Sequence, residues 1–225
     1  MDKTASLFKN LKEVKVIDSS IDYSDYVAVD LSASNEEISK LNITDALAFE
    51  NYIEGYLTKN NAKVAFGGYR EIRNLYKRST VFNSENSEER NIHIGLDLWI
   101  KAETSVLAAL DGTIHSFQNN TALGDYGPTI ILEHQFEGIK FHTLYGHLSL
   151  DSLNDKQIGT EVKKGAIIAT LGSPPINGDY APHLHFQIIM DIAHKTGDYP
   201  GVCNIKDLEF YTANCPDPNL LLKIK

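Results

Sequence analysis

Short apolar runs separated by turn residues fill most of the chain after its first 62 residues. They have the length and the β-branched content of strands, and Gly, Asp and Asn residues stand between them where turns are expected. This pattern predicts a mainly β domain over 63–225, a small antiparallel β-sheet of barrel or sandwich type, after an N-terminal α+β extension over 1–62. Local hairpins are expected within Ser105–Phe117 and Gly159–Leu171. The runs are Val64–Phe66, Ser105–Leu110, Thr113–Phe117, Thr129–His134, Lys140–Tyr145, Ala166–Leu171 and His183–Met190.

The N-terminal extension follows a different pattern. Val14–Ile17 and Tyr26–Leu31 are typical of short strands. Ser34 and Glu37 have the spacing of a capping box, which predicts a helical stretch that continues to about Leu57. Nothing in the extension suggests chemistry, so we expect a cover over the later domain. One hypothesis is that this cover blocks a groove in the domain.

Charge and cysteine content narrow the choice of partners. The formal net charge of −9 makes phosphate backbones and anionic membranes unsuitable partners. No apolar run has the length of a membrane span, and the N-terminus lacks the apolar core of a signal peptide. We therefore expect a protein that is cytoplasmic as written, or periplasmic or extracellular if a signal has been removed. Cys203 and Cys215 lack the C-x-x-C spacing, so two reduced thiols are expected, with a disulfide as the alternative in an oxidising compartment.

Two motifs place candidate metal ligands on strands. His183 and His185 lie two residues apart in an apolar run, so on a strand both imidazoles point to the same face. His93 and Asp97 lie four residues apart, which in a straight strand is roughly 13 Å. That distance is too long for two ligands that share one ion with bonds of about 2 Å. We therefore predict a bend or bulge at Gly95, where it costs least.

The third motif is Tyr145-Gly-His147, at the end of another apolar run. Together the three motifs predict a hydrolytic metal site. Two histidines and one carboxylate leave an open position on a zinc ion, as a hydrolytic site requires. The predicted ligands are His93, Asp97 and His185, and His147 and His183 flank them. A flanking imidazole can take a proton from water or stabilise a developing oxyanion. Non-haem iron oxygenases use the same ligand set, so iron is an alternative.

The motifs His93-x-x-x-Asp97, Tyr145-x-His147 and His183-x-His185, in this order, resemble those of the lysostaphin/LytM-type zinc metallopeptidases. The resemblance implies a small antiparallel β metallopeptidase domain with a groove over Zn²⁺. The activity it implies is that of a peptidoglycan endopeptidase, which cleaves cell-wall cross-bridges or stem peptides, often beside glycine. The roles it implies are zinc ligation by His93, Asp97 and His185 and catalysis by His147 and His183.

Three further stretches, Asp125–His134, Pro182–Ile189 and Cys215–Leu222, resemble a subgroup found fused inside cytosolic kinase-like and aminotransferase proteins. This second resemblance favours a cytosolic amide hydrolase of a small substrate as an alternative to a cell-wall enzyme. A non-catalytic binding or regulatory module on the same fold is a further alternative. The expected partner is a peptide or peptidoglycan-like substrate, with no nucleic acid and no membrane. The sequence leaves the oligomeric state open.

Overall fold

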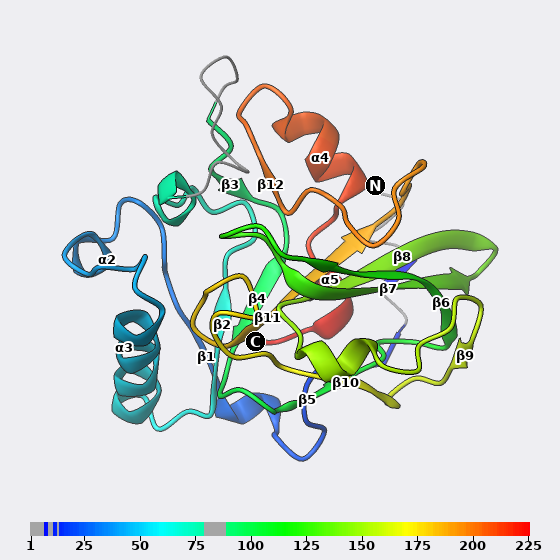
Figure 1. The fold of residues 1–225 in the computed structure, drawn as a ribbon, viewed down its shortest axis with the longest axis horizontal. Helices are drawn as coiled ribbons and strands as arrows, with labels where there is room; N and C mark the ends of the chain where they lie inside the picture. Colours follow the sequence, from blue (N-terminus) through cyan, green and yellow to red (C-terminus); the bar gives the residue numbers. More distant parts are fainter. Residues whose placement is uncertain (1–6, 9–10, 13, 79–88) are drawn as a thin grey trace.

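A computed structural model of the chain describes residues 7–8, 11–12, 14–78 and 89–225. Its main element is an eight-stranded sheet with the strand order β1-β2-β4-β11-β8-β7-β6-β9 (Figure 1). β1 and β2 are parallel, and all other neighbours in this sheet are antiparallel. The predicted mainly β fold is therefore confirmed. The strands are β1 (Tyr26–Ala28), β2 (Val64–Gly67), β4 (Leu96–Trp99), β6 (Gly112–Asn120), β7 (Gly127–Phe136), β8 (Ile139–Gly146), β9 (Glu161–Val162) and β11 (His183–Ile189).

Two small sheets and several short helices complete the fold. β5 (Ser105–Leu107) pairs with β10 (Ile167–Thr170), and β3 (Ile92–His93) pairs with β12 (Val202–Cys203). No helix in the described ranges has both the length and the apolar character needed to cross a membrane. The helices are α2 (Glu36–Ser39), α3 (Ala46–Lys59), α4 (Leu208–Asn214) and α5 (Asn219–Leu222), and 3₁₀ turns lie at η1 (Tyr23–Asp25), η2 (Leu75–Arg78) and η3 (Leu150–Leu153).

The predicted local hairpins within Ser105–Phe117 and Gly159–Leu171 are wrong. β5 pairs with β10 and β6 pairs with β9, so the two segments pair with each other and not internally. Between these pairs, Ala108 N donates to Ala166 O at 2.9 Å and Gly165 N donates to Ala108 O at 2.8 Å. The sequence predicts the turns correctly. A turn alone, however, does not determine whether the two strands beside it pair with each other.

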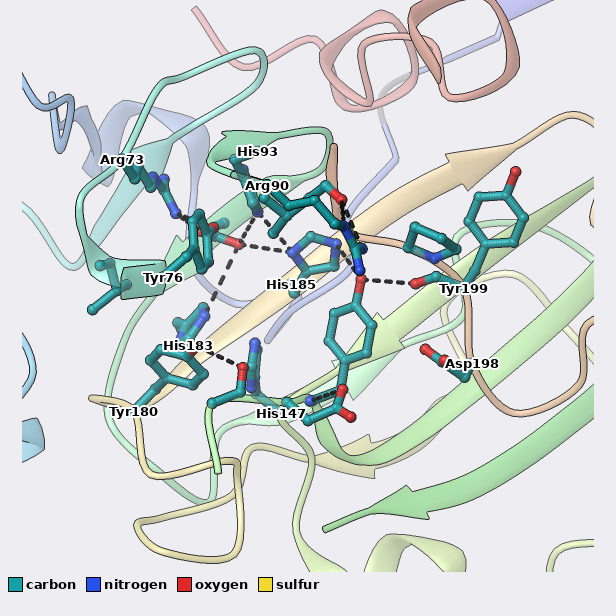
Figure 2. Close-up of a pocket in the computed structure, with 18 of the residues that line it drawn as sticks. Arg73, Tyr76, Arg90, His93, His147, Tyr180, His183, His185, Asp198 and Tyr199 are labelled. Atoms are coloured by element: carbon teal, nitrogen blue, oxygen red, sulfur yellow. Dashed lines mark hydrogen bonds and ion pairs between the residues drawn. The ribbon is translucent and has the colours of Figure 1, made fainter. Parts of the chain in front are cut away.

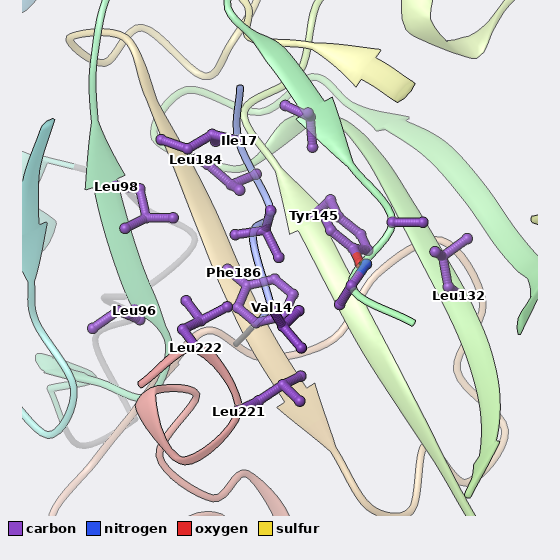
Figure 3. Packing of buried hydrophobic residues seen from close by; sticks show 14 of the residues in the cluster. Val14, Ile17, Leu96, Leu98, Leu132, Tyr145, Leu184, Phe186, Leu221 and Leu222 are labelled. Atoms are coloured by element: carbon purple, nitrogen blue, oxygen red, sulfur yellow. The ribbon is translucent and has the colours of Figure 1, made fainter. Parts of the chain in front are cut away.

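The two central strands β4 and β11 have faces of opposite character, because successive side chains of a strand point to opposite sides. One face carries Asp97, His183 and His185, which gather in a pocket (Figure 2). In the antiparallel register of these strands Asp97 lies directly opposite His185. The other face packs into the main hydrophobic core (Figure 3) through Leu96, Leu98, Leu184, Phe186 and Ile188.

The N-terminal extension contributes to this core and to the sheet. β1 confirms a part of the strand predicted at Tyr26–Leu31. The strand predicted at Val14–Ile17 is wrong, since only an isolated bridge joins Ile17 to Val106. Val14 and Ile17 are nevertheless fully buried in the main core, beside residues of β11 and α5 (Figure 3).

The single predicted helical stretch is two helices, and its predicted cap is wrong. Asn35, not Ser34, caps α2, because its side chain accepts a hydrogen bond from Glu37 N at 2.9 Å. A second cap, Asp45, starts α3 by accepting from Ala48 N at 3.0 Å. Asn and Asp are both preferred N-cap residues, so two caps in close succession divide the stretch.

His134 on β7 is buried in the sheet. Its Nδ1–H donates to Asp111 O at 2.9 Å, and its Nε2 lies 2.7 Å from Thr143 Oγ1. Burial lowers the pKa of His134 to about 4. Between about pH 6.5 and 4 the unfolded chain therefore binds more protons at this residue than the folded chain does. Stability falls as the pH drops through that window, by at most roughly 3 kcal/mol from this group.

We expect His134→Gln to reduce the loss of unfolding free energy on acidification from pH 6.5 to 4.5. The measurement is urea denaturation of the metal-free protein at several pH values. His194→Gln is the matched control, because His194 is exposed in a loop. A pH dependence in His134→Gln as steep as that of the wild type would contradict this prediction.

Candidate metal centre

Three strand segments bring His93, Asp97 and His185 together (Figure 2). His93 Nε2 lies 2.8 Å from His185 Nδ1 and 3.3 Å from Asp97 Oδ1. His185 Nδ1 lies 3.2 Å from the same carboxylate oxygen. The predicted bend is confirmed, because β3 ends at His93, the chain bends at Gly95 and β4 begins at Leu96. A Cβ at Gly95 would lie 2.4 Å from the His185 ring, so glycine also permits this close approach.

Hydrogen bonds on the outer side of each imidazole fix its tautomer. His93 Nδ1–H donates to Gly68 O at 2.9 Å, which leaves a lone pair on Nε2. His185 Nε2 lies 2.9 Å from Gln187 Oε1. The amide nitrogen of Gln187 donates to Pro200 O at 3.1 Å, so Oε1 must accept from His185. His185 Nδ1 therefore also presents a lone pair to the cluster.

The cluster thus joins three acceptor atoms with no proton between them. All three residues are at most 2% exposed. Burial lowers the pKa of His93 to about 4. Burial alone would raise the pKa of Asp97, but the guanidinium of Arg73 holds it well below its usual range. Converging lone pairs repel one another unless a cation lies among them.

A metal dication fits this donor set. Zinc bonds of 2.0–2.1 Å in tetrahedral geometry place ligand atoms roughly 3.3 Å apart, close to the three separations observed. Within the described ranges this is the one group of three His, Cys, Asp or Glu ligand atoms that lie within 4.8 Å of one another. The three residues can therefore hold a metal ion.

His147 and His183 lie beside the cluster, with their rings 4.1 Å apart at the centroids. His147 Nδ1–H donates to Asn177 O at 2.7 Å, and His183 Nδ1–H donates to Ala181 O at 2.8 Å. Both Nε2 atoms therefore carry lone pairs, and that of His183 lies 4.0 Å from Asp97 Oδ1. Burial lowers the pKa of His183 to about 4, and burial with two neighbouring imidazoles lowers the pKa of His147 well below its usual range. Both imidazoles are neutral proton acceptors.

The surrounding structure holds these two imidazoles in place. His147 has a φ of 61°, a left-handed conformation that is costly for a residue with a Cβ and that often marks functional sites. His183 stacks on Trp99 at 3.9 Å between ring centroids. Trp99 in turn contacts Phe49 of α3 edge to face at 5.0 Å. The N-terminal extension therefore supports His183 from behind.

A cavity of about 170 Å³ opens over the cluster and includes all five predicted residues in its lining. Tyr126, Tyr180 and Tyr199 are among the residues that line it, and Figure 2 shows Tyr180 and Tyr199 beside the histidines. No described residue of the N-terminal extension lines the cavity. The hypothesis that the extension blocks the groove is therefore wrong for the described residues.

Sequence reasoning missed several residues that contact the cluster, among them Gln187 and Arg73. Gln187 follows His185 at the same-face spacing of a strand, so alternation along β11 was a usable signal. Arg73 donates to Asp97 Oδ2 at 2.5 Å from a segment 24 residues earlier in the chain. No local pattern points to Arg73, because tertiary structure alone brings it to Asp97.

Comparison with known proteins gives one family match. Residues 91–197 match the family model described as Peptidase family M23. This range contains all five predicted site residues. No curated protein matches the chain.

Solved structures of similar proteins include a Pseudomonas aeruginosa protein described as a peptidase M23, with 18% identity over 59% of this chain and a TM-score of 0.39. This chain covers 44% of that protein. The catalytic domain of lysostaphin from Staphylococcus simulans has 25% identity, with 68% of this chain and 94% of that domain covered and a TM-score of 0.41. Csd3 from Helicobacter pylori has 26% identity, with 55% and 32% covered and a TM-score of 0.35. Residues 91–197 therefore match peptidase family M23, and this match supports the predicted resemblance to the lysostaphin/LytM-type family.

Proposed function

We propose that the chain is a zinc-dependent hydrolase of the metalloendopeptidase type that cleaves peptide or amide bonds. By family resemblance, its substrates are peptidoglycan cross-bridges or stem peptides. The observation that carries the proposal is the cluster of three unprotonated donor atoms with two neutral imidazoles beside it, inside a domain of a peptidase family. The division into an extension (1–62) and a metallopeptidase domain (63–225) is part of the same proposal.

In this mechanism His93, Asp97 and His185 would hold the ion. When bound, zinc would act as a Lewis acid and lower the pKa of a water molecule at this site. Nε2 of His147 or His183 accepts the proton that the attacking water loses, because the carbonyl partners of Nδ1 keep Nε2 unprotonated. The imidazolium then donates to the developing oxyanion or to the leaving amine.

The flanking imidazoles also favour zinc over iron in this proposal. A hydrolase needs a group that accepts and returns a proton, whereas oxygen chemistry on a two-histidine, one-carboxylate site has no general need for such a pair. Two buried neutral histidines next to the ligands, His147 and His183, match the first requirement.

The cavity limits what can reach these groups. A volume of about 170 Å³ is small for a ligand site. It has room for a short stretch of extended chain or a small amide. A small cytosolic amide is therefore the second candidate substrate, and the test includes both classes.

Removal of the metal is expected to abolish hydrolysis. The purified chain is first analysed for its native metal, and then dialysed against a chelator and reloaded with Zn²⁺ or Fe²⁺. Each form is incubated with purified peptidoglycan, a short-peptide library and a panel of small amides, and released amino groups are counted. We expect cleavage of at least one substrate that disappears in the apo form and returns with Zn²⁺.

The other outcomes separate the alternatives. Recovery with Fe²⁺ alone, together with native iron, would contradict the zinc proposal. If the zinc-loaded chain binds the metal but cleaves none of the three substrate classes, the binding-module alternative holds. Cleavage of amides without cleavage of peptidoglycan would assign the small-substrate activity.

A further inference from the structure

A buried ion-pair chain leads from the N-terminal extension to the candidate ligand Asp97. Arg73 is 2% exposed, and its Nη1 donates to Asp97 Oδ2 at 2.5 Å. Its Nε donates to Glu71 Oε2, also at 2.5 Å. The second oxygen of Glu71 accepts from Leu31 N at 2.9 Å. The backbone of the extension thus fixes Glu71, which fixes Arg73, which contacts the carboxylate of the ligand.

In this arrangement the two carboxylate oxygens of Asp97 have different partners. Oδ1 faces the lone pairs of His93 and His185, and Oδ2 is taken by Arg73. A carboxylate held in this way offers one oxygen to a metal and cannot rotate to offer both. The guanidinium of Arg73 suits this task, since its planar, rigid set of donors contacts Asp97 and Glu71 at the same time.

The same segment also holds the ligand His93. Gly68 O accepts from His93 Nδ1, and a Cβ at Gly68 would lie 2.2 Å from Arg73 Nη2. The φ of Gly68 is 104°, a conformation that L side chains rarely adopt. The chain from Gly68 to Arg73 therefore packs tightly against two of the three ligands.

Net stability does not explain a guanidinium in this place. A buried ion pair contributes little to stability, because desolvation offsets the attraction. Arg73 Nη2 is buried without a hydrogen-bond partner in the described part of the chain, which adds a further cost. Its clearest effect is on the orientation and the charge of Asp97.

We propose that Arg73 is a positioning residue that holds Asp97 as a one-oxygen metal ligand, with Glu71 and Leu31 N keeping Arg73 in place. The inference rests on the proposed metal site. It goes beyond the family match, because Leu31, Glu71 and Arg73 all lie outside residues 91–197. Residues of the extension and of the segment after β2 are thereby part of the working site.

The test measures zinc affinity by competition with a chromogenic chelator on full-length variants. Arg73→Met is expected to weaken zinc binding about 10–100-fold, as loss of a hydrogen-bond partner behind a metal ligand typically does. Arg73→Lys keeps the charge but not the paired donors and should fall between the wild type and Arg73→Met. Arg70→Gln is the matched control, because Arg70 is exposed on the same segment. It should leave the affinity unchanged.

A second readout separates positioning from a merely structural role. The absorption bands of the Co²⁺-loaded protein report on the ligand oxygens, and they should shift in Arg73→Lys and not in Arg70→Gln. If Arg73→Met does not fold, Arg73→Lys and Glu71→Gln carry the test, and both should show weaker zinc binding and shifted bands. Folded variants at Arg73 with wild-type affinity and wild-type bands would overturn the inference.

These measurements do not depend on turnover, so the two proposals fail separately. If the wild type binds zinc but hydrolyses nothing, the proposed activity is wrong and the role of Arg73 still holds. If the wild type hydrolyses peptides and Arg73→Met binds zinc with wild-type affinity, only the proposed role of Arg73 is wrong.

Discussion

His185→Ala is expected to remove stoichiometric zinc binding from the chain. The substitution deletes one of three donor atoms and leaves His93 and Asp97, which cannot enclose an ion by themselves. Structural zinc sites bind with about 10–16 kcal/mol. If three ligands share this free energy evenly, loss of one weakens affinity on the order of 10²–10⁴-fold. The measurement is metal content by mass spectrometry after dialysis, followed by a chelator competition titration.

His115→Ala is the control for this experiment, because His115 lies on β6 and does not line the cavity over the cluster. It should retain one zinc ion per chain with wild-type affinity. Both variants are compared with the wild type in thermal unfolding without metal, so that misfolding is detected. One zinc ion bound to His185→Ala with wild-type affinity would show that the ion lies elsewhere.

The parts of the site that the sequence predicts are those set by local geometry. His183 and His185 share a face because a strand repeats every two residues, and this holds wherever the strand pairs. The bend at Gly95 follows from bond lengths, since His93 and Asp97 cannot meet across a straight strand. The predicted strand positions lie close to the observed ones for the same reason, because each apolar run is recognised from its own residues.

The features that the sequence does not predict depend on contacts between segments that lie far apart in the chain. β5 joins β10 because two turns come together in space, and no feature of either run encodes that partner. Asp97 lies opposite His185 only because β4 and β11 are neighbours in this register. Arg73 is likewise not predictable from the sequence, because its contact with Asp97 exists only in the folded chain. Side-chain contacts between segments far apart in sequence need the fold before they can be assigned.

His147→Ala is expected to lower kcat by roughly 10²–10⁴-fold, the usual contribution of a positioned acid–base group, while zinc stays bound. His147 is not one of the three converging donor residues, so its loss should leave metal content unchanged. The measurement is steady-state kinetics on the best substrate from the panel, with zinc content determined on the same samples. His142→Ala is the matched control, because His142 lies on β8 five residues earlier and does not line the cavity.

Comparison with His183→Ala then tests whether the two imidazoles work together. Their rings lie 4.1 Å apart, and both Nε2 atoms are free of protons. If they serve one proton transfer as a pair, the double variant should lose little more activity than either single variant, since residues that act as a unit are not additive. Fully multiplicative losses would assign them to separate steps, one taking the proton of water and the other stabilising the oxyanion. An unchanged kcat in His147→Ala with zinc bound would remove this imidazole from the mechanism and leave His183 as the single proton acceptor beside the ion.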